Sequence, residues 1–265
     1  MTGQTHARTA LRTALAALFL IAGLSARADA QTIAPTAETA AAVESFHAAR
    51  TDRYAWVEET ETPTLNAKGA AVVRVLERAE RQGLRSADYR LPATDSPTAL
   101  DHAVSLTLLR YLTDLQAGRV APKKADPALY VFPRQVDGLA LLQAVHAAPE
   151  TAKAMADLAP ANPVYRRLRR LLLDYRALAR TGGWHPVSEG PTLKPGMTDP
   201  RVSEVRRRLS STADLTPVSG ASDLYDPALE SAVRQFQRRH GLDSDGAVGA
   251  KTVAAMNVPV QDRIR

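Results

Sequence analysis

The chain has 265 residues, of which 45% are hydrophobic but only 5% aromatic, and its formal net charge is +6 at pH 7. This length allows one or two domains with real cores, and the abundance of aliphatic side chains favours helices packed through Leu, Val and Ala. The absence of cysteine excludes disulfides, thiolate metal sites and a thiol nucleophile in these residues, and a mild charge with few stacking aromatics argues against nucleic acid as a partner.

The first 30 residues have the pattern of a secretory signal peptide. A basic start precedes an apolar run at residues 14–24, which is too short to span a bilayer comfortably, and Ala28-Asp29-Ala30 places small residues where a signal peptidase cleaves. We predict cleavage between Ala30 and Gln31, export by the general secretion route and a periplasmic location. Loss of three arginines and one aspartate would lower the net charge from +6 to +4. The alternative is an uncleaved signal that anchors the chain, the one membrane contact that the sequence suggests.

Residues 38–180 are predicted to form a helical domain, because apolar side chains recur at helical spacing and no alternating strand pattern of useful length occurs. Ser96-Pro97 and Asn162-Pro163 each pair a capping side chain with a proline at the first helical position, and Gly118 is a stop signal. Helices are expected at residues 38–49, 67–82, 97–117, 138–147, 151–158 and 163–180. The expected buried face of the last helix consists of Val164, Leu168, Leu171, Leu172, Tyr175 and Leu178.

Two connecting stretches are expected in this part of the chain. Residues 119–137 are irregular, and a loop of this length in a compact domain is usually functional or an extended crossover. Residues 181–192 are a predicted linker, with Gly182-Gly183-Trp184-His185 at its tip. We expect the indole of Trp184 to anchor the linker to a domain rather than to stack on a sugar ring.

Three short helices are predicted within residues 193–257, each with one apolar side and each too short to be stable alone. Asp199-Pro200 starts the first helix, which carries Val202, Val205 and Leu209 on one face. Asp226-Pro227 starts the second, and its apolar stripe is Leu229, Ala232, Val233, Phe236 and His240, the last at a position that the helix dipole favours for histidine. Gly241 can end this helix in the left-handed conformation, Asp245-Gly246 makes a turn, and Gly249 precedes a helix with Val253 and Met256. The predicted fold is all-α, with a helical domain followed by a small three-helix bundle.

The ordered residues of this bundle resemble the small peptidoglycan-binding domain of bacterial wall enzymes. The resemblance rests on residues 199–209, Tyr225-Asp226, Ala232-Val233, Phe236-Gln237, Gly241-Leu242, Asp245-Gly246, Val248-Gly249, Thr252 and Asn257. It implies binding to murein, not chemistry on it. From their exposure on the predicted elements we select as ligand-binding candidates Tyr225, Arg234, Arg238, Asp245 and Lys251.

The preceding region resembles the helical scaffold of large L,D-transpeptidases. The matching residues are Ser45-Phe46, Ala55-Trp56-Val57, Ala79, Gly83-Leu84, Asp88-Tyr89, Tyr111-Leu112, residues 115–120, and Asp126-Pro127 with Tyr130. In that family a scaffold precedes a peptidoglycan-binding domain, and the resemblance implies an enzyme of cell-wall biogenesis that cross-links stem peptides between two diaminopimelate residues through a cysteine thioester. Because this chain has no cysteine, no catalytic residue is predicted, and residues 258–265 resemble the lead-in to a catalytic domain. The implied partners are peptidoglycan and a linked or separate transpeptidase domain.

Basic residues gather at Arg206-Arg207-Arg208 and at Arg238-Arg239. In a run of three on a helix we expect only one side chain to face inward, which leaves most of these guanidinium groups in water. Two interpretations stay open, a solubilising face or forked hydrogen bonds to the carboxylates of stem peptides.

Two other functions remain as alternatives. A stand-alone periplasmic wall-binding protein would recruit a partner enzyme. A lytic enzyme would use paired carboxylates, for which the candidates are Glu58-Glu59, Asp223 with Asp226, and Asp243 with Asp245. No cofactor or metal is predicted, since the six histidines are scattered, and no serine lies in a motif for acyl transfer.

Overall fold

The computed structural model describes residues 36–120, 122–132, 134–216 and 222–264. The chain divides into two units, Met1–Ile33 and Ala34–Arg265, and only the second contains described residues. The predicted signal segment and its cleavage point lie outside the described residues, so both stay predictions. Within the described part no strand forms, and pairing between extended segments is limited to isolated bridges such as Leu193 with Val248. The all-α prediction is confirmed.

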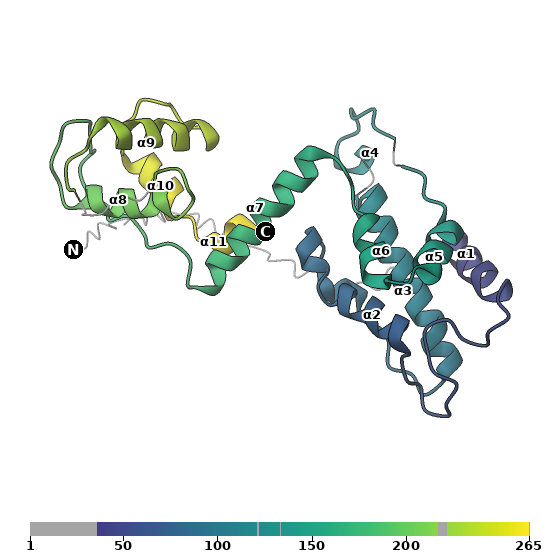
Figure 1. Ribbon diagram of the computed structural model, residues 1–265. Helices are drawn as coiled ribbons and strands as arrows, with labels where there is room; N and C mark the ends of the chain where they lie inside the picture. The colour runs from purple at the N-terminus through teal and green to yellow at the C-terminus, as the bar shows by residue number, and fades with distance from the viewer. Residues whose placement is uncertain (1–35, 121, 133, 217–221, 265) are drawn as a thin grey trace, which may run out of the picture. The chain divides into compact units, whose positions relative to one another are not determined.

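The elements follow one another along the chain in the order that Figure 1 shows by colour. They are α1 (Ala37–Ala48), α2 (Ala67–Leu76), η1 (Ala79–Gln82), η2 (Ser86–Tyr89), α3 (Pro97–Ala117), α4 (Pro122–Ala125), α5 (Gly138–Ala147), α6 (Thr151–Asp157), α7 (Pro163–Arg180), α8 (Arg201–Ser210), α9 (Pro227–Arg239), α10 (Ala250–Asn257) and α11 (Val260–Ile264). The helix predicted at residues 67–82 is interrupted: α2 ends at Leu76, and the chain tightens into the 3-10 turn η1.

The first core is built around α3. Ser96 caps this helix by accepting a hydrogen bond from the Ala99 amide at 3.3 Å, Pro97 occupies the first turn, and Gly118 ends it, as the sequence predicts. Helices α1, α2 and α5 pack against it. The buried side chains of this core include Val43, Phe46, Trp56, Val72, Leu76, Leu108, Leu112, Leu142 and Met155.

The predicted buried face of α7 is wrong in part, because Leu172, Tyr175 and Leu178 are only half-buried and the other three residues are exposed. Val164, Leu168 and Leu171 are 64%, 60% and 47% exposed, and no residue of this helix is fully buried. The main contacts of α7 with other elements are with the four-residue turn η1 and the five-residue helix α11. Two such short partners cover only part of an 18-residue helix, so a strong apolar stripe is left facing solvent.

The second core joins α8, α9 and α10. The fully buried residues include Leu193, Val202, Val205, Leu209, Tyr225, Leu229, Val233, Phe236, Val248 and Met256, so the apolar faces predicted for these short helices are confirmed. Asp226 caps α9 by accepting from the Leu229 amide at 2.8 Å. Trp184 anchors the linker as expected: its Nε1 donates to the Val258 carbonyl at 3.1 Å, and the guanidinium of Arg208 lies 3.7 Å from its ring centroid.

Candidate functional site

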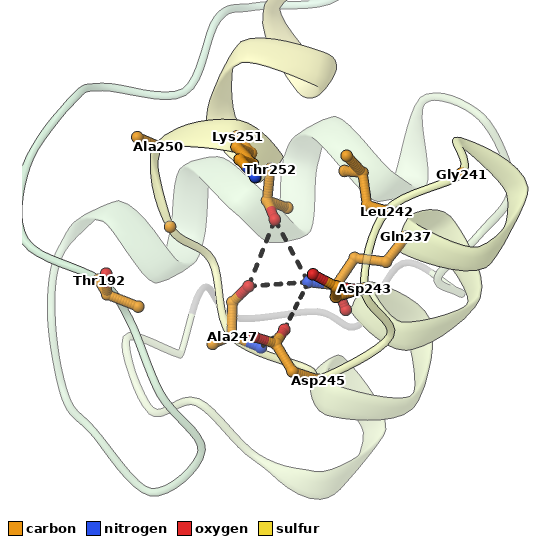
Figure 2. A pocket seen from close by; sticks show the side chains of 11 residues that line it. Thr192, Gln237, Gly241, Leu242, Asp243, Asp245, Ala247, Ala250, Lys251 and Thr252 are labelled. Carbon is orange, nitrogen blue, oxygen red and sulfur yellow. Dashed lines mark hydrogen bonds between the residues drawn. The ribbon is translucent and has the colours of Figure 1, made fainter.

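A pocket of about 370 Å³ lies where the end of α9, the loop at residues 241–249 and the start of α10 meet. Eleven residues line it, and Figure 2 shows them around one hollow. The volume falls within the range of small ligand sites, about 300–1,000 Å³. Thr192 lies on its far rim, on a segment that is tied to the loop by two backbone hydrogen bonds between Leu193 and Val248.

The end of α9 directs the chain into this loop. Gly241 takes a φ of 66°, a left-handed conformation that costs glycine little, and the Leu242 amide returns to the Gln237 carbonyl at 2.9 Å. The stop predicted at Gly241 is thereby confirmed. His240 donates from Nδ1 to the Phe236 carbonyl at 2.8 Å. Burial lowers its pKa, so the packing opposes the charged form that the helix dipole would favour.

The side chain of Gln237 connects the elements that form the pocket. Its side chain is 1% exposed, and its Nε2 lies 2.8 Å from Asp245 Oδ1, 2.9 Å from the Ala247 carbonyl and 3.2 Å from Thr252 Oγ1. Its Oε1 accepts the Gly246 amide at 2.9 Å. One amide side chain therefore ties α9 to the loop and to the first turn of α10, as the dashed lines in Figure 2 show.

Gly246 and Tyr225 complete this support. Gly246 has a φ of 75°, and a Cβ added there would come within 3.0 Å of the side chains of Arg234 and Glu230, so this turn requires glycine. Tyr225 is 1% exposed and donates from its hydroxyl to the Gly246 carbonyl at 2.6 Å. Burial raises the pKa of this phenol and keeps it protonated as the donor.

The five predicted ligand residues fall into two groups. Asp245 and Lys251 line the pocket. Tyr225 lies in the core, Arg234 is engaged with Glu230 and with the Ser244 carbonyl, and Arg238 is an exposed residue with one long contact of 3.4 Å to Ser244. Their roles in binding stay predictions.

Among the lining residues with polar side chains, four are not in the predicted ligand set: Thr192, Gln237, Asp243 and Thr252. Gln237 and Thr252 belong to the motif residues of the resemblance, and Asp243 was considered only as a catalytic carboxylate. Asp243 and Thr252 lie close in sequence to the Asp245-Gly246 turn, whereas Thr192 reaches the pocket only through the folded chain, by the pairing of Leu193 with Val248. For Gln237, however, the distant contacts that make it important appear only in the folded chain.

The surroundings of Asp245 do not suit the general acid of a glycan hydrolase. The pKa of Asp245 is lowered, first by the Ala247 amide at 2.9 Å and then by the amide of Gln237. A general acid for glycan cleavage needs a raised pKa, which is the opposite direction. In the other candidate pairs, Asp226 caps α9 and binds Arg206, while Glu58 and Glu59 are exposed.

The prediction that one arginine of residues 206–208 faces inward is wrong, because two do. Arg206 is 9% exposed and donates to the carbonyls of Ser222 and Leu224 and to Asp226. Arg208 is 2% exposed and donates from Nε to the Met256 carbonyl at 2.7 Å, and burial lowers its pKa to about 10, so it stays charged at neutral pH. These guanidinium groups stabilise the bundle and are not available to a ligand.

A second constellation lies in the first core. His47 Nε2 is 2.9 Å from Ser105 Oγ, and His47 Nδ1 is 3.3 Å from the Asp101 carboxylate, which is the order of a serine–histidine–aspartate triad. Ser105 is fully buried, however, and accepts the Trp56 indole N–H at 2.8 Å, while Asp101 accepts the amides of Ala55 and Trp56. A nucleophile without access to substrate cannot react, so this network fixes the Trp56 segment on α3.

Two further observations concern metals and membranes. Within the described residues no group of three or more His, Asp or Glu side chains is placed to share a metal ion. Among the same residues, none of the helices combines the length and apolar character needed to cross a bilayer.

Comparison with known families matches two parts of the chain. Residues 41–172 match the model of a scaffold domain, and residues 198–256 match that of a putative peptidoglycan binding domain. A search of curated proteins gives no match. The second range contains α8, α9, α10 and nearly the whole pocket lining. The match supports peptidoglycan as the binding partner of this part of the chain.

Proposed function

We propose that the chain holds peptidoglycan near a transpeptidase active site and does so as the scaffold and wall-binding portion of an L,D-transpeptidase. The observation that carries the proposal is the succession along the chain of a scaffold-domain match and a peptidoglycan-binding match, the second of which holds a preorganised pocket. The order is that of the family which the sequence resembles.

The proposed mechanism is positioning. A bound murein strand stays close to the enzyme, so its encounter with the active site becomes effectively intramolecular and its local concentration rises. The described residues of this chain supply binding and orientation, and the linked or partner domain supplies the nucleophile. The proposed site of action is the periplasm, reached after cleavage between Ala30 and Gln31. Mass spectrometry of the protein recovered from the periplasm tests this step, since an intact N-terminus would contradict it.

Wall binding is tested by sedimentation with purified sacculi. Because the exposed charges are screened over about 3 Å at 1 M salt, binding that persists at this concentration cannot be charge attraction alone. Retention of the protein by sacculi at both low and high salt is the expected result. A protein that stays in the supernatant, or that is released completely by salt, would contradict specific binding.

The transpeptidase assignment needs a separate experiment in the host. Deleting residues 193–257 should lower the fraction of murein cross-links that join two diaminopimelate residues. An unchanged fraction, with sacculus binding intact in the full chain, would favour a stand-alone wall-binding protein. Incubating sacculi with the purified protein tests the lytic alternative, which release of muropeptides would support.

A further inference from the structure

The pocket carries charges of both signs that the protein itself does not use. Asp243 and Lys251 both line it, and neither forms a hydrogen bond or ion pair through its side chain with the described part of the chain. Figure 2 shows that the two residues come from different elements, Asp243 from the loop after α9 and Lys251 from the first turn of α10. Asp245 adds a second carboxylate, of which Oδ1 is bound by Gln237 and Ala247.

Most other cations of residues 193–257 are occupied by the fold. Arg201 binds Asp199, Arg206 binds Asp226, Arg234 binds Glu230 and Arg239 binds Asp214, while Arg208 is buried against Met256 and Trp184. Lys194, Arg207 and Arg238 are exposed but do not line the pocket. The cation that the pocket offers to a ligand is therefore Lys251.

The lining contains no aromatic residue. Sugar rings present apolar C–H faces that proteins commonly cover with aromatic side chains, and a neutral glycan has no groups that pair with one ammonium and two carboxylates. A peptide with a free carboxylate and a free amino group has both. Peptidoglycan contains such groups in its stem peptide, which bears a diamino acid and ends in a carboxylate.

We propose that this pocket binds the peptide stem of peptidoglycan rather than its glycan strand, with Lys251 facing the C-terminal carboxylate of the stem and Asp243 facing the amino group of its diamino acid. This inference rests on the proposed wall-binding function and adds the part of the polymer that is recognised. The buried Gln237 network fixes the loop between the two charged residues, so their spacing is set before the ligand arrives.

The test pairs protein variants with chemically matched ligands. The probe is a fluorescently labelled stem tetrapeptide with a free C-terminal carboxylate and a free diamino-acid amine, used beside its C-terminal amide and its N-acetylated form. The variants are Lys251→Gln and Asp243→Asn in the full chain, and Arg207→Gln is the control that removes an exposed charge outside the pocket. Fluorescence anisotropy measures the dissociation constants.

Each charge contributes an exposed ion pair, so we expect Lys251→Gln to weaken binding of the free-acid peptide by about two- to five-fold. The same variant should bind the C-terminal amide as the wild-type protein does, because the partner charge is already gone. Asp243→Asn should show the corresponding loss with the free amine and none with the acetylated peptide. Arg207→Gln should match the wild-type protein with every ligand.

A second binding experiment uses sacculi from which an amidase has removed the stem peptides. It distinguishes a failure of peptide recognition from a failure of the proposed wall-binding function. Retention on intact sacculi with loss on stripped sacculi is the expected result. Equal binding to both, or variants that bind every peptide as the wild-type protein does, would overturn peptide recognition while wall binding stands. Failure of the wild-type protein to bind intact sacculi would overturn both.

Discussion

Replacing Gln237 by leucine should loosen the pocket and destabilise the second core. Leucine has a similar volume but supplies no acceptor for the buried Gly246 amide and no donor for Asp245 or the Ala247 carbonyl. A buried N–H left without a partner costs about 1–3 kcal/mol, and each hydrogen bond lost from a group that keeps another partner costs about 0.5–1.5 kcal/mol. Ala247 retains a long contact from Thr252, and Asp245 retains the Ala247 amide, so we expect a total loss of about 2–6 kcal/mol.

The neighbouring Gln235 provides the matched control. It lies on the same helix α9 but is exposed, so Gln235→Leu should change the free energy of unfolding by less than about 0.5 kcal/mol. Urea unfolding measures the two variants, and hydrogen exchange of the Gly246 amide gives a local measurement of the same network. If Gln237→Leu unfolds like Gln235→Leu and the Gly246 amide stays protected, the Gln237 network does not hold the loop.

Three further predictions concern ionisable side chains that pack within the two cores. Arg208→Met should lower the stability of the bundle by about 2–3 kcal/mol through loss of the Met256 hydrogen bond and the indole contact, and an effect no larger than that of the exposed Arg207→Met would contradict this. Asp101→Ala should cost about 3 kcal/mol or more in urea unfolding, because two buried amides lose their acceptor; a neutral effect would show that the segment packs without it. Burial and the charge of Arg50 lower the pKa of His146 from 6.5 to about 4, so the unfolded chain binds more protons between these values. The stability that the neutral imidazole contributes is full above pH 6.5 and falls as the pH drops towards 4, and His146→Gln should flatten this part of the profile.

The positions of the helix ends could be predicted because they are determined by residues that lie close together in the sequence. Asp226 caps α9 through an amide three residues away, Gly241 ends the same helix, and Gly118 ends α3. Each signal depends on neighbours in the sequence and on backbone conformations that few residue types adopt. The same reasoning explains why the apolar faces of α8 and α9 were predicted correctly, since a three-helix bundle supplies a partner for each face.

The exposed stripe of α7 marks the limit of this reasoning. Helical periodicity shows which side of a helix is apolar, but burial also requires a second element of matching length. Val164, Leu168 and Leu171 satisfy the first condition and lack the second within the described residues. The candidate site is subject to the same limit, because the contacts of Gln237 join residues that are separated by up to 15 positions.

The arginines show why formal charge is a poor guide to what a surface can bind. A run such as residues 206–208 suggests a cationic patch, yet Arg206 and Arg208 donate hydrogen bonds to backbone carbonyls of distant segments. A guanidinium group has five donors in a rigid fork, so it satisfies backbone acceptors where a bundle of short helices leaves them open. Lys251 makes no such contact with the described chain and remains available at the pocket. In the carboxylate recognition that we propose for the pocket, the cation is therefore Lys251 rather than one of these arginines.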